Sequence, residues 1–447
     1  MTVVTTHFMT EAGQQLFASQ SVETPFIVAK IQAEAATAWL ASPWPTRKTE
    51  AWKYTPLKAV TEAHFIPLNN KDVALTSAAK TKTTIADLNA IKLVFVDGVL
   101  DVAASHNLQN LPTGLTIALF NETTVTQKEI IAQHFNKAAG EHATLFGHLN
   151  IAATTAGVLI HIAKNTLLNQ PVHVLHYAQS ASAGYANARV LWVQELNSQA
   201  TLVEQFMGEN NAPVFTNSIT ELFVGDNAAC EHYRLHLEDE ANLHIGGVYS
   251  HLQKSSRLNS FYVAMGSNLQ RVDVVTQFEG EGGEAINNGV YLPVNQQLTD
   301  FHTCIEHKMP HCTSNEIFRG IIGDSARAVF NGRIHIHRDA QKTLAELSNK
   351  NLLTSAKAEV NTKPELEIYA DDVRCAHGAT IAELDPLAMH YLRTRGISQA
   401  EAQVMLSFGF INELIEQLNN PAIKAYLKPV IAQRFAKEPA LMQHLIG

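Results

Sequence analysis

The sequence predicts a mainly β protein whose strand-rich core lies between two helical regions. From about Gly157 to Glu383, short segments of alternating apolar and polar residues follow one another with hardly a helix-length amphipathic run between them. Charged residues make up 17% of the chain, against roughly 25% in typical globular proteins, which suits backbone-paired sheet. The 447 residues are enough for two or three packed regions. We expect an N-terminal helical region with a small hairpin (1–150), a β core (151–384) and a C-terminal helical subdomain (385–447).

The N-terminal region begins with a predicted helix. Thr24 is a suitable N-cap, Pro25 suits the first helical position, and Pro43 and Pro45 end the run. The apolar residues at helical spacing are Phe26, Ala29, Ala33, Ala36 and Leu40. The nearby tryptophans Trp39, Trp44 and Trp52 predict aromatic core packing. Further along, Leu93–Leu100 predicts a hairpin around an Asp-Gly turn, and a helix is expected around Lys128–Lys137.

The core segments fit either a β-sandwich or barrel, or a β-solenoid. Most of their junctions lack a hairpin-type Asn-Gly turn, which favours the solenoid, and the irregular turn spacing excludes a hexapeptide repeat. The histidines of these segments are expected to face outward or to be hydrogen-bonded strand residues. The segments are Gly157–Ile162, Pro171–Tyr177, Ala188–Val193, Ala200–Phe206, Cys230–Leu237, Leu258–Val263, Gln270–Phe278 and Ala328–Ile336, and the histidines are His161, His173, His176, His232, His236, His335 and His337.

The C-terminal region predicts three helices. Asp385 and Pro386 form an N-cap followed by proline, and Gly396 can end that first helix. Ser398 and Glu401 form a capping box, and a last helix is expected from Pro421 to Phe435. The second helix carries an apolar stripe that we expect to lie mostly between the last two helices, as a self-contained unit. The stripe is Ala402, Met405, Phe408, Leu414, Ile415 and Leu418.

Composition and motifs exclude several classes of function. The net charge of −9 and the absence of a Lys/Arg stripe argue against nucleic-acid binding. No apolar run reaches the roughly 18 residues of a membrane helix, and the start lacks the pattern of a signal peptide, so we expect a cytoplasmic protein. The sequence contains no Walker A motif, no dinucleotide-binding glycine pattern and no nucleophile elbow. We therefore expect no nucleotide site of its own.

Cys375 and His377 are the strongest candidates for metal or sulfur chemistry. Alternation on a strand places both on one face, where a thiolate and an imidazole make a soft two-point ligand for iron or zinc. On spacing alone, a buried cysteine beside a hydrogen-bonded histidine is the more common outcome. The four cysteines, at 230, 304, 312 and 375, contain no Cys-x-x-Cys pair, which argues against a permanent four-thiolate cluster.

A denser group of ligands lies in His302–Cys312, which has three histidines and two cysteines in eleven residues. This is enough for a tetrahedral zinc site, although Pro310 breaks the segment and strand alternation sends side chains to opposite faces. A zinc-binding solenoid therefore stays an alternative. His311 and Cys312 are secondary candidates for cluster chemistry.

Several segments of the last third of the chain, and one near the N-terminus, match the sequence signature of a known family. They are Met309–Glu316, Val329–Ile334, Ala340–Thr343, Asn349–Leu353, Lys363–Thr380 and Tyr391–Gly396, with Arg47–Thr55 near the N-terminus. In these segments the chain resembles the SufD type of the SufB/SufD family, scaffold subunits of SUF iron–sulfur cluster assembly. Cys375-Ala-His-Gly-Ala-Thr380 favours SufD over SufB, whose sequence is closer to His-Glu-Ala-Thr at that place. Ala376, where the family more often has Ser, and Leu384–Tyr391 depart from the family pattern.

The resemblance implies a right-handed parallel β-helix that acts as a non-catalytic scaffold. It implies pairing with a SufB-like paralogue through the last strands, a SufC-like ATPase on the C-terminal helices, and a transient iron–sulfur cluster shared at the junction near Cys375 and His377. The isolated chain could also pair with itself. We expect the partner-binding helices to involve Met405, Phe408, Leu414 and Ile415. The alternative is an exported polysaccharide-active β-helix enzyme that uses Asp371 and Asp372, although adjacent strand residues face opposite sides.

Overall fold

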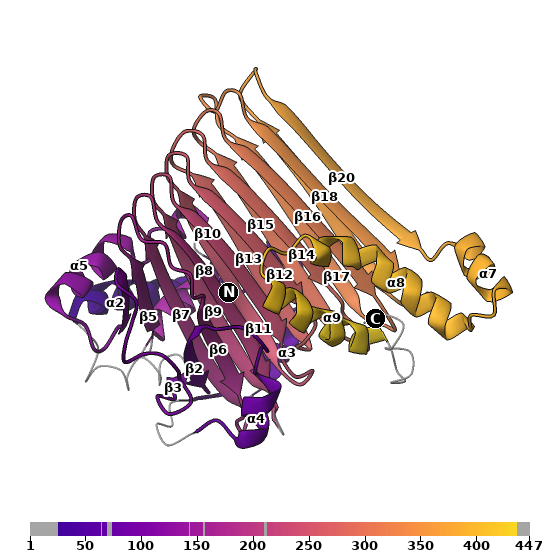
Figure 1. Ribbon diagram of the computed structural model, residues 1–447, viewed down its shortest axis with the longest axis horizontal. Helices are drawn as coiled ribbons and strands as arrows, with labels where there is room; N and C mark the ends of the chain where they lie inside the picture. The colour runs from indigo at the N-terminus through magenta and orange to yellow at the C-terminus, as the bar shows by residue number, and fades with distance from the viewer. Residues whose placement is uncertain are drawn as a thin grey trace, which may run out of the picture.

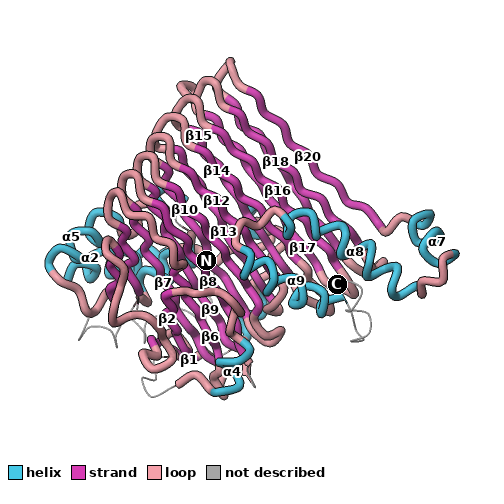
Figure 2. Tube along the Cα trace, in the orientation of Figure 1, coloured by secondary structure: helices cyan, strands magenta, loops and turns pink. Residues whose placement is uncertain are grey.

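The computed structural model in Figure 1 describes residues 26–435 except 64, 69–73, 143, 155–156 and 210–211. Its centre is a parallel β-solenoid, as the strand pattern favoured over a sandwich or barrel. From β5 onward the chain alternates between two facing sheets, A and B, so that each turn adds one strand to each. The tube in Figure 2 shows the helices lying beside these strands rather than between them.

Both sheets have ten strands. Sheet A contains β1 (Ile66–Pro67), β4 (Leu115–Leu119), β5 (Gly157–Ile162), β7 (Gly184–Gln194), β9 (Val214–Val224), β11 (Leu243–Leu252), β13 (Leu269–Phe278), β15 (Leu298–His307), β17 (Arg327–Ile336) and β19 (Glu359–Ile368). Sheet B contains β2 (Ile91–Val96), β3 (Val99–Leu100), β6 (Val172–Ala178), β8 (Gln199–Gly208), β10 (Ala229–Leu237), β12 (Arg257–Ala264), β14 (Glu284–Tyr291), β16 (Thr313–Ile322), β18 (Leu344–Leu353) and β20 (Arg374–Glu383).

Pairing is parallel and in register, so side chains of successive turns stack in files. Leu243 pairs with Leu269, and Arg327 pairs with Glu359, so one turn takes 26 to 32 residues without a fixed repeat. Alternate residues of every strand face the solenoid interior. The largest hydrophobic cluster fills that interior and includes Trp192, Phe278, Phe301 and Phe330.

The turns between the sheets use residues that tolerate a left-handed backbone. Asn165, Asn197 and Asn227 occupy equivalent positions with φ of +54 to +59°, a region that asparagine adopts more readily than most residues. Their side chains form a ladder, because Asn197 donates to Asn165 at 3.0 Å and Asn227 donates to Asn197 at 2.8 Å. These short polar turns replace the hairpin turns that the sequence lacks.

The two ends of the solenoid differ. At the N-terminal end, β3 and β4 pair antiparallel with β2 and β5 and close the sheets. At the C-terminal end, β19 and β20 are the last strands of their sheets, and within the described residues no strand pairs with their outer edges. The first end is closed, and the second presents free backbone groups.

The N-terminal region forms the predicted helix and hairpin. The first helix, α2 (Phe26–Ala41), stops just before Pro43, and the turn at Asp97 pairs Val96 with Val99. Its buried face is Gln32, Ala35 and Trp39, whereas Ala33 and Leu40 of the predicted stripe are exposed, because the large Trp39 ring decides which face meets the core. The proposed cap at Thr24 and Pro25 lies outside the described residues.

The other elements of this region are short. The predicted helix at Lys128–Lys137 is α5 (Val125–His134), which starts earlier because Thr124 and Gln127 form a capping box. Trp39 and Trp52 are buried in one cluster, with Trp44 packed against it. The remaining elements are α3 (Lys58–Glu62), α4 (Ser77–Lys82), α6 (Leu145–Ala152), η1 (Glu50–Trp52) and η2 (Gly140–His142).

The C-terminal helices are α7 (Pro386–Thr394), α8 (Gln399–Glu416) and α9 (Pro421–Phe435). Asp385 caps α7, and Ser398 with Glu401 caps α8, as predicted. The apolar stripe does not make a self-contained unit: α8 and α9 pack on the outer face of sheet B, against residues such as Tyr233, Leu235 and Phe261. Among the described residues, no helix is long and apolar enough to span a membrane.

Candidate functional site

Cys375 and His377 lie on β20, the outermost strand of sheet B. They pair in register with Ala345 and Leu347, two residues of the interior cluster, so both project toward the inner side of the last turn. Cys375 is half-buried against this cluster, and burial raises the pKa of its thiol. His377 is exposed, and its side chain has no hydrogen-bond or ion-pair partner among the described residues. The histidine is therefore not the hydrogen-bonded strand residue of the more common outcome.

Two ligands do not hold an iron–sulfur cluster by themselves, because such clusters take four protein ligands. The surroundings of Cys375 and His377 leave room for more. Above them is the free edge of β20, and exposed apolar side chains lie along the last turn and on α7, which we call the open-end patch. Its residues are Leu344, Ile368, Tyr369, Ile381, Leu387 and Tyr391, each at least 40% exposed.

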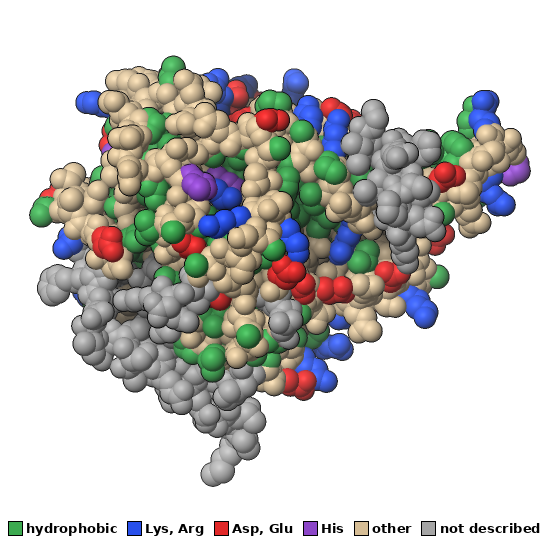
Figure 3. Space-filling view, turned by 60° about the horizontal axis from the view of Figure 1, so that its bottom comes forward, with side chains coloured by type: hydrophobic (Ala, Val, Ile, Leu, Met, Phe, Trp, Pro, Cys, Tyr) green, Lys and Arg blue, Asp and Glu red, His purple; other side chains and the backbone are tan. Residues whose placement is uncertain are grey.

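The helix α7 carries part of this patch away from the body of the protein. No residue of α7 is buried, and Leu387 is 78% exposed. In Figure 3, the projecting end at the right shows hydrophobic side chains beside Lys and Arg. Isolated large apolar residues on a surface are ordinary, but six of them along the last turn and on the adjoining helix, beside a free sheet edge, indicate a contact surface.

His311 and Cys312, the secondary candidates, point in different directions. His311 sits in a turn with φ +60° and is exposed, 4.0 Å from Glu281. Cys312 is fully buried in the interior cluster, where its thiol lies 3.4 Å from the Gly280 carbonyl oxygen and burial raises its pKa. Because His311 lies exposed in the turn and Cys312 points into the interior, the two side chains cannot form one site.

The His302–Cys312 segment as a whole does not gather into a zinc site. His302 lies 3.1 Å from Asp300, whereas His307 faces the interior, stacks on Phe278 and contacts Ser314 at 2.9 Å. Strand alternation separates these ligands, as its period of two requires. The segment therefore does not form a single zinc site by itself, which is the alternative that strand alternation argued against. Cys304 and Glu306 are on the outer face and join a different group, described below.

The residues expected to mark the partner-binding helices are mostly core residues. Phe408, Leu414 and Ile415 are buried against the outer face of sheet B, and only Met405 is exposed, at 38%. Burial excludes the first three from contact with another chain in this conformation. A partner of these helices would meet Met405, α7 and the polar outer side of α8.

Of the strand histidines expected to face outward or to be hydrogen-bonded, several are of the second kind and lie in the interior. His232 and His236 are fully buried on the inward face of β10, on either side of Arg234. His232 contacts Glu204 at 2.9 Å, and Arg234 contacts the same carboxylate at 2.7 Å. They are hydrogen-bonded, as expected, but as members of a buried network. Strand alternation alone does not show which face of a mixed strand is inside.

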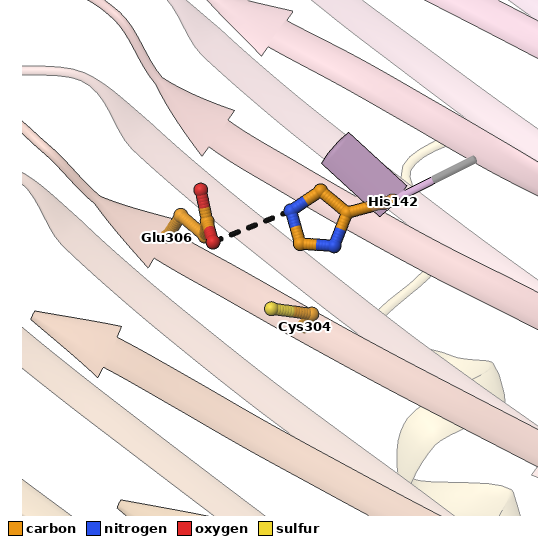
Figure 4. A group of neighbouring side chains, drawn as sticks. All are labelled: His142, Cys304 and Glu306. Carbon is orange, nitrogen blue, oxygen red and sulfur yellow. Dashed lines mark ion pairs between the residues drawn. The ribbon is translucent and has the colours of Figure 1, made fainter. Parts of the chain in front are cut away.

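A second ligand group, which the sequence did not indicate, lies on the outer face of sheet A. Cys304 and Glu306 of β15 face His142 of η2, with the Nε2 of His142 3.3 Å from a carboxylate oxygen of Glu306 (Figure 4). His335 of β17 approaches the same carboxylate at 3.5 Å. Their separation in sequence hides this group, because only the docking of η2 on the sheet brings His142 to Glu306.

A third group is fully buried near the interior network. His244 contacts Glu238 at 2.5 Å through Nδ1 and Ser218 at 2.6 Å through Nε2. His236 accepts from the Nε of Arg234 at 3.1 Å. Since both nitrogens of His244 are already hydrogen-bonded and Arg234 adds positive charge, this group is part of the polar core.

The aspartates of the alternative enzyme hypothesis are turn residues. Asp371 and Asp372 lie just before β20, where the carboxylate of Asp372 pairs with Lys342 and its N–H donates to the side chain of Gln341 at 2.9 Å. Asp372 thus holds the turn together, and no facing carboxylate pair forms there.

Comparison with known proteins gives matches along nearly the whole chain. Residues 176–410 match the family "SUF system FeS cluster assembly, SufBD core domain", and residues 10–174 match "SufBD protein N-terminal region". The iron–sulfur cluster assembly protein SufD of Escherichia coli is 31% identical over 87% of this chain and 89% of its own length. A SufBD family protein of Synechocystis is 28% identical over 87% of each chain, and the chloroplastic protein ABCI7 of Arabidopsis thaliana is 28% identical over 92% of this chain and 86% of its own.

Proposed function

Because this chain belongs to the SufB/SufD family of SUF iron–sulfur cluster assembly proteins, as a member of the SufD type, we propose that it is a non-catalytic scaffold subunit. In this proposal it pairs with a SufB-like paralogue, a nascent cluster forms transiently at the junction near Cys375 and His377, and a SufC-like ATPase binds at the C-terminal helices. The finished cluster then passes to acceptor proteins.

The observation that carries this proposal is the difference between the two ends of the solenoid. Antiparallel strands close the N-terminal end, whereas β19 and β20 have free outer edges beside the open-end patch. A free strand edge pairs readily with another strand, since its backbone N–H and C=O groups lack partners. A second solenoid with a similar free end would continue both sheets and cover the patch.

Cys375 and His377 then lie in the contact itself. Their side chains project toward the inner side of the last turn, so the facing last turn of the partner would supply the further ligands that a cluster needs. The raised pKa of the Cys375 thiol keeps it protonated until iron or a charged group arrives. The pair contributes ligands, and the partner completes the set.

The ATPase contact would use the part of the helical subdomain that the solenoid leaves open. The exposed apolar residues there are Leu387, Tyr391 and Met405. Arg393 and Arg395 of α7 and its C-cap add positive charge. The sequence has no Walker A motif, which is consistent with ATP hydrolysis by another subunit.

The test is cluster reconstitution on the assembled complex. We expect His377→Ala and Cys375→Ser to lower bound iron and sulfide strongly while co-purification of the partners stays intact, because edge pairing involves backbone and apolar groups. His311→Ala is the matched control, since that histidine is an exposed turn residue just before β16, two strands away from β20. Equal cluster loading of wild-type and His377→Ala complexes, or a larger loss in His311→Ala, would show that the site is wrongly assigned.

A further inference from the structure

Five side chains with metal-ligating atoms form two overlapping groups on the outer face of sheet A. The ligand atoms of His142, Cys304 and Glu306 lie within 4.8 Å of one another, and the same holds for Glu306, His335 and His337. Glu306 is common to both groups. The His142, Glu306 and His335 side chains are 10–18% exposed, so an ion could enter from solvent and still be largely enclosed.

The position of His142 is built into the fold. The preceding segment is held on sheet A by buried Glu221, whose carboxylate accepts from the backbone N–H groups of Asn136 at 2.9 Å and Ala138 at 3.1 Å. Gln277 donates to the Ala138 carbonyl oxygen at 2.8 Å. Ala138 and Ala139 pack in the same small cluster as Cys304. These contacts bring His142 to Glu306 before any ion binds, which is the preorganisation that a metal site needs.

We propose that His142, Cys304 and Glu306 bind a zinc-type divalent ion, with the fourth position open to water or to His335, which lies 3.5 Å from the same Glu306 carboxylate. Imidazole, thiolate and carboxylate together suit Zn²⁺ in tetrahedral geometry, whereas Mg²⁺ and Ca²⁺ prefer oxygen ligands alone. The thiolate and the carboxylate balance the two charges of the ion, so the bound site is neutral. Cys375 and His377 are not ligands of this zinc site. A failed test of the site would therefore leave the proposed scaffold function unaffected, and the reverse also holds.

Arg333 places its positive charge beside the same Cys304 and Glu306 side chains that the ion would bind. Its Nη2 is 3.3 Å from the Cys304 sulfur and 3.9 Å from Glu306, while its Nη1 is 3.5 Å from Glu367. When the ion binds, the Cys304 thiol releases its proton to solvent, and Arg333 keeps Glu367 as its anionic partner. Lys308 lies 3.7 Å from the other oxygen of Glu306 and 2.7 Å from Glu279, so it too keeps a partner. Arg333 is therefore a competitor of the ion.

The experiment titrates the full-length protein with Zn²⁺ by calorimetry and with Co²⁺ by absorption spectroscopy. We expect one site with a thiolate-to-cobalt charge-transfer band that excess Zn²⁺ removes and excess Mg²⁺ does not. Cys304→Ser should lose the band and bind Zn²⁺ at least about tenfold more weakly. Arg333→Gln should bind more tightly, because it removes the competing cation. His161→Gln, at a histidine of the same sheet that pairs with Glu195 and belongs to neither ligand group, is the matched control and should leave band and affinity unchanged.

The variants also provide the contrary outcomes. A folded Cys304→Ser protein with the wild-type band and affinity would overturn the proposal, as would an Arg333→Gln protein with unchanged or weaker affinity. Loss of the band in Cys375→Ser alone would place the ion at β20 instead. Should Cys304→Ser not fold, His142→Gln in the short η2 segment decides through its affinity: a tenfold loss supports the site and an unchanged value refutes it.

Discussion

Glu204 and Arg234 face each other in the solenoid interior, 2.7 Å apart and almost completely removed from solvent. Although burial opposes ionisation, the charge of Arg234 and the contact with His232 hold the pKa of Glu204 well below its usual range. Thr220 donates to the same carboxylate at 2.7 Å. An interior that contains charges stays stable only while each charge has its partners.

Replacing Glu204 with Gln should therefore be strongly destabilising. The change leaves Arg234 buried without a counter-charge, which typically costs about 3–5 kcal/mol of unfolding free energy. Urea unfolding followed by circular dichroism measures it. Glu346→Gln, at an exposed position of β18, is the control and should change stability by less than about 0.5 kcal/mol. Similar unfolding midpoints for both variants would contradict this account.

Glu316 is a second buried carboxylate, inward-facing and in the same file as Leu347 and His377. Burial raises its pKa to about 8, and the hydroxyl of Thr303 opposes the shift only in part. The folded protein therefore holds a proton that the unfolded chain, with a pKa of 4.5, releases as pH rises. The stability contribution of this group is complete below pH 4.5 and is lost between pH 4.5 and 8.

Glu316→Gln should remove that pH dependence. The wild-type protein loses up to about 1.4 kcal/mol per pH unit in this interval relative to the variant, so the variant gains stability over wild type as pH rises from 5 to 8. Unfolding curves at both pH values measure the difference. Parallel pH profiles of wild type and Glu316→Gln would show that the carboxyl group ionises normally.

At the scale of elements, the C-terminal helices belong to the solenoid. Arg319 of β16 donates to the Phe410 carbonyl oxygen at 2.6 Å and contacts Glu413 at the same distance. Arg434 of α9 donates to the Leu292 carbonyl oxygen at 3.0 Å. With the apolar cluster below them, these contacts make α8 and α9 a cover for sheet B. Removing the chain from Ile397 onward would expose this apolar face of sheet B. The helices are therefore not the self-contained unit that we expected from the sequence.

Single substitutions on α8 should separate core from surface. Ile415→Ala should lower the unfolding free energy by about 2–5 kcal/mol, because Ile415 is fully buried against sheet B. Met405→Ala, on the exposed side of the same helix, should cost less than about 1 kcal/mol. Thermal unfolding of both variants makes the comparison. A larger loss for Met405→Ala would mean that α8 packs through its other face.

At the scale of the whole molecule, antiparallel strands close the N-terminal end of the solenoid, whereas β19 and β20 have free outer edges at the C-terminal end. Arg374 donates its N–H to Thr343 toward the body of the sheet, and strand alternation then directs the N–H of Ala379 to the free edge and that of Thr380 to β18. A substitution that removes the N–H of Ala379 therefore affects only pairing with another chain. A substitution that removes the N–H of Thr380 affects the pairing of β20 with β18, and so the fold itself.

Ala379→Pro should leave the isolated protein folded and weaken its association with a SufB-like partner at least about tenfold, because proline removes an edge-facing donor. Thr380→Pro, the matched variant, should destabilise β20 itself by about 3 kcal/mol. Size-exclusion chromatography of the co-expressed pair, with thermal unfolding of each single chain, distinguishes them. Wild-type association by Ala379→Pro would argue against edge pairing through β20.

The sequence by itself determined the order and type of the elements. Alternation predicted the strand stretch that runs from β5 to β20, Asp-Gly predicted the hairpin, and the caps at Asp385 and Ser398 predicted α7 and α8. These signals are local, since turn chemistry and capping act over a few residues. The sequence segment around Cys375 and His377 also predicted the SufD-type family that the comparisons show.

Only the tertiary structure decided which faces are buried and which distant residues meet. It turned His232 and His236 inward and buried Phe408, Leu414 and Ile415 of α8 against sheet B. It also left His311 exposed in a turn while Cys312 points into the interior. It also brought His142 to Glu306, 164 positions along the chain, through the docking of η2 on sheet A. The physical reason is that alternation defines two faces of a strand without stating which is inside. The choice depends on what the rest of the chain packs against each face.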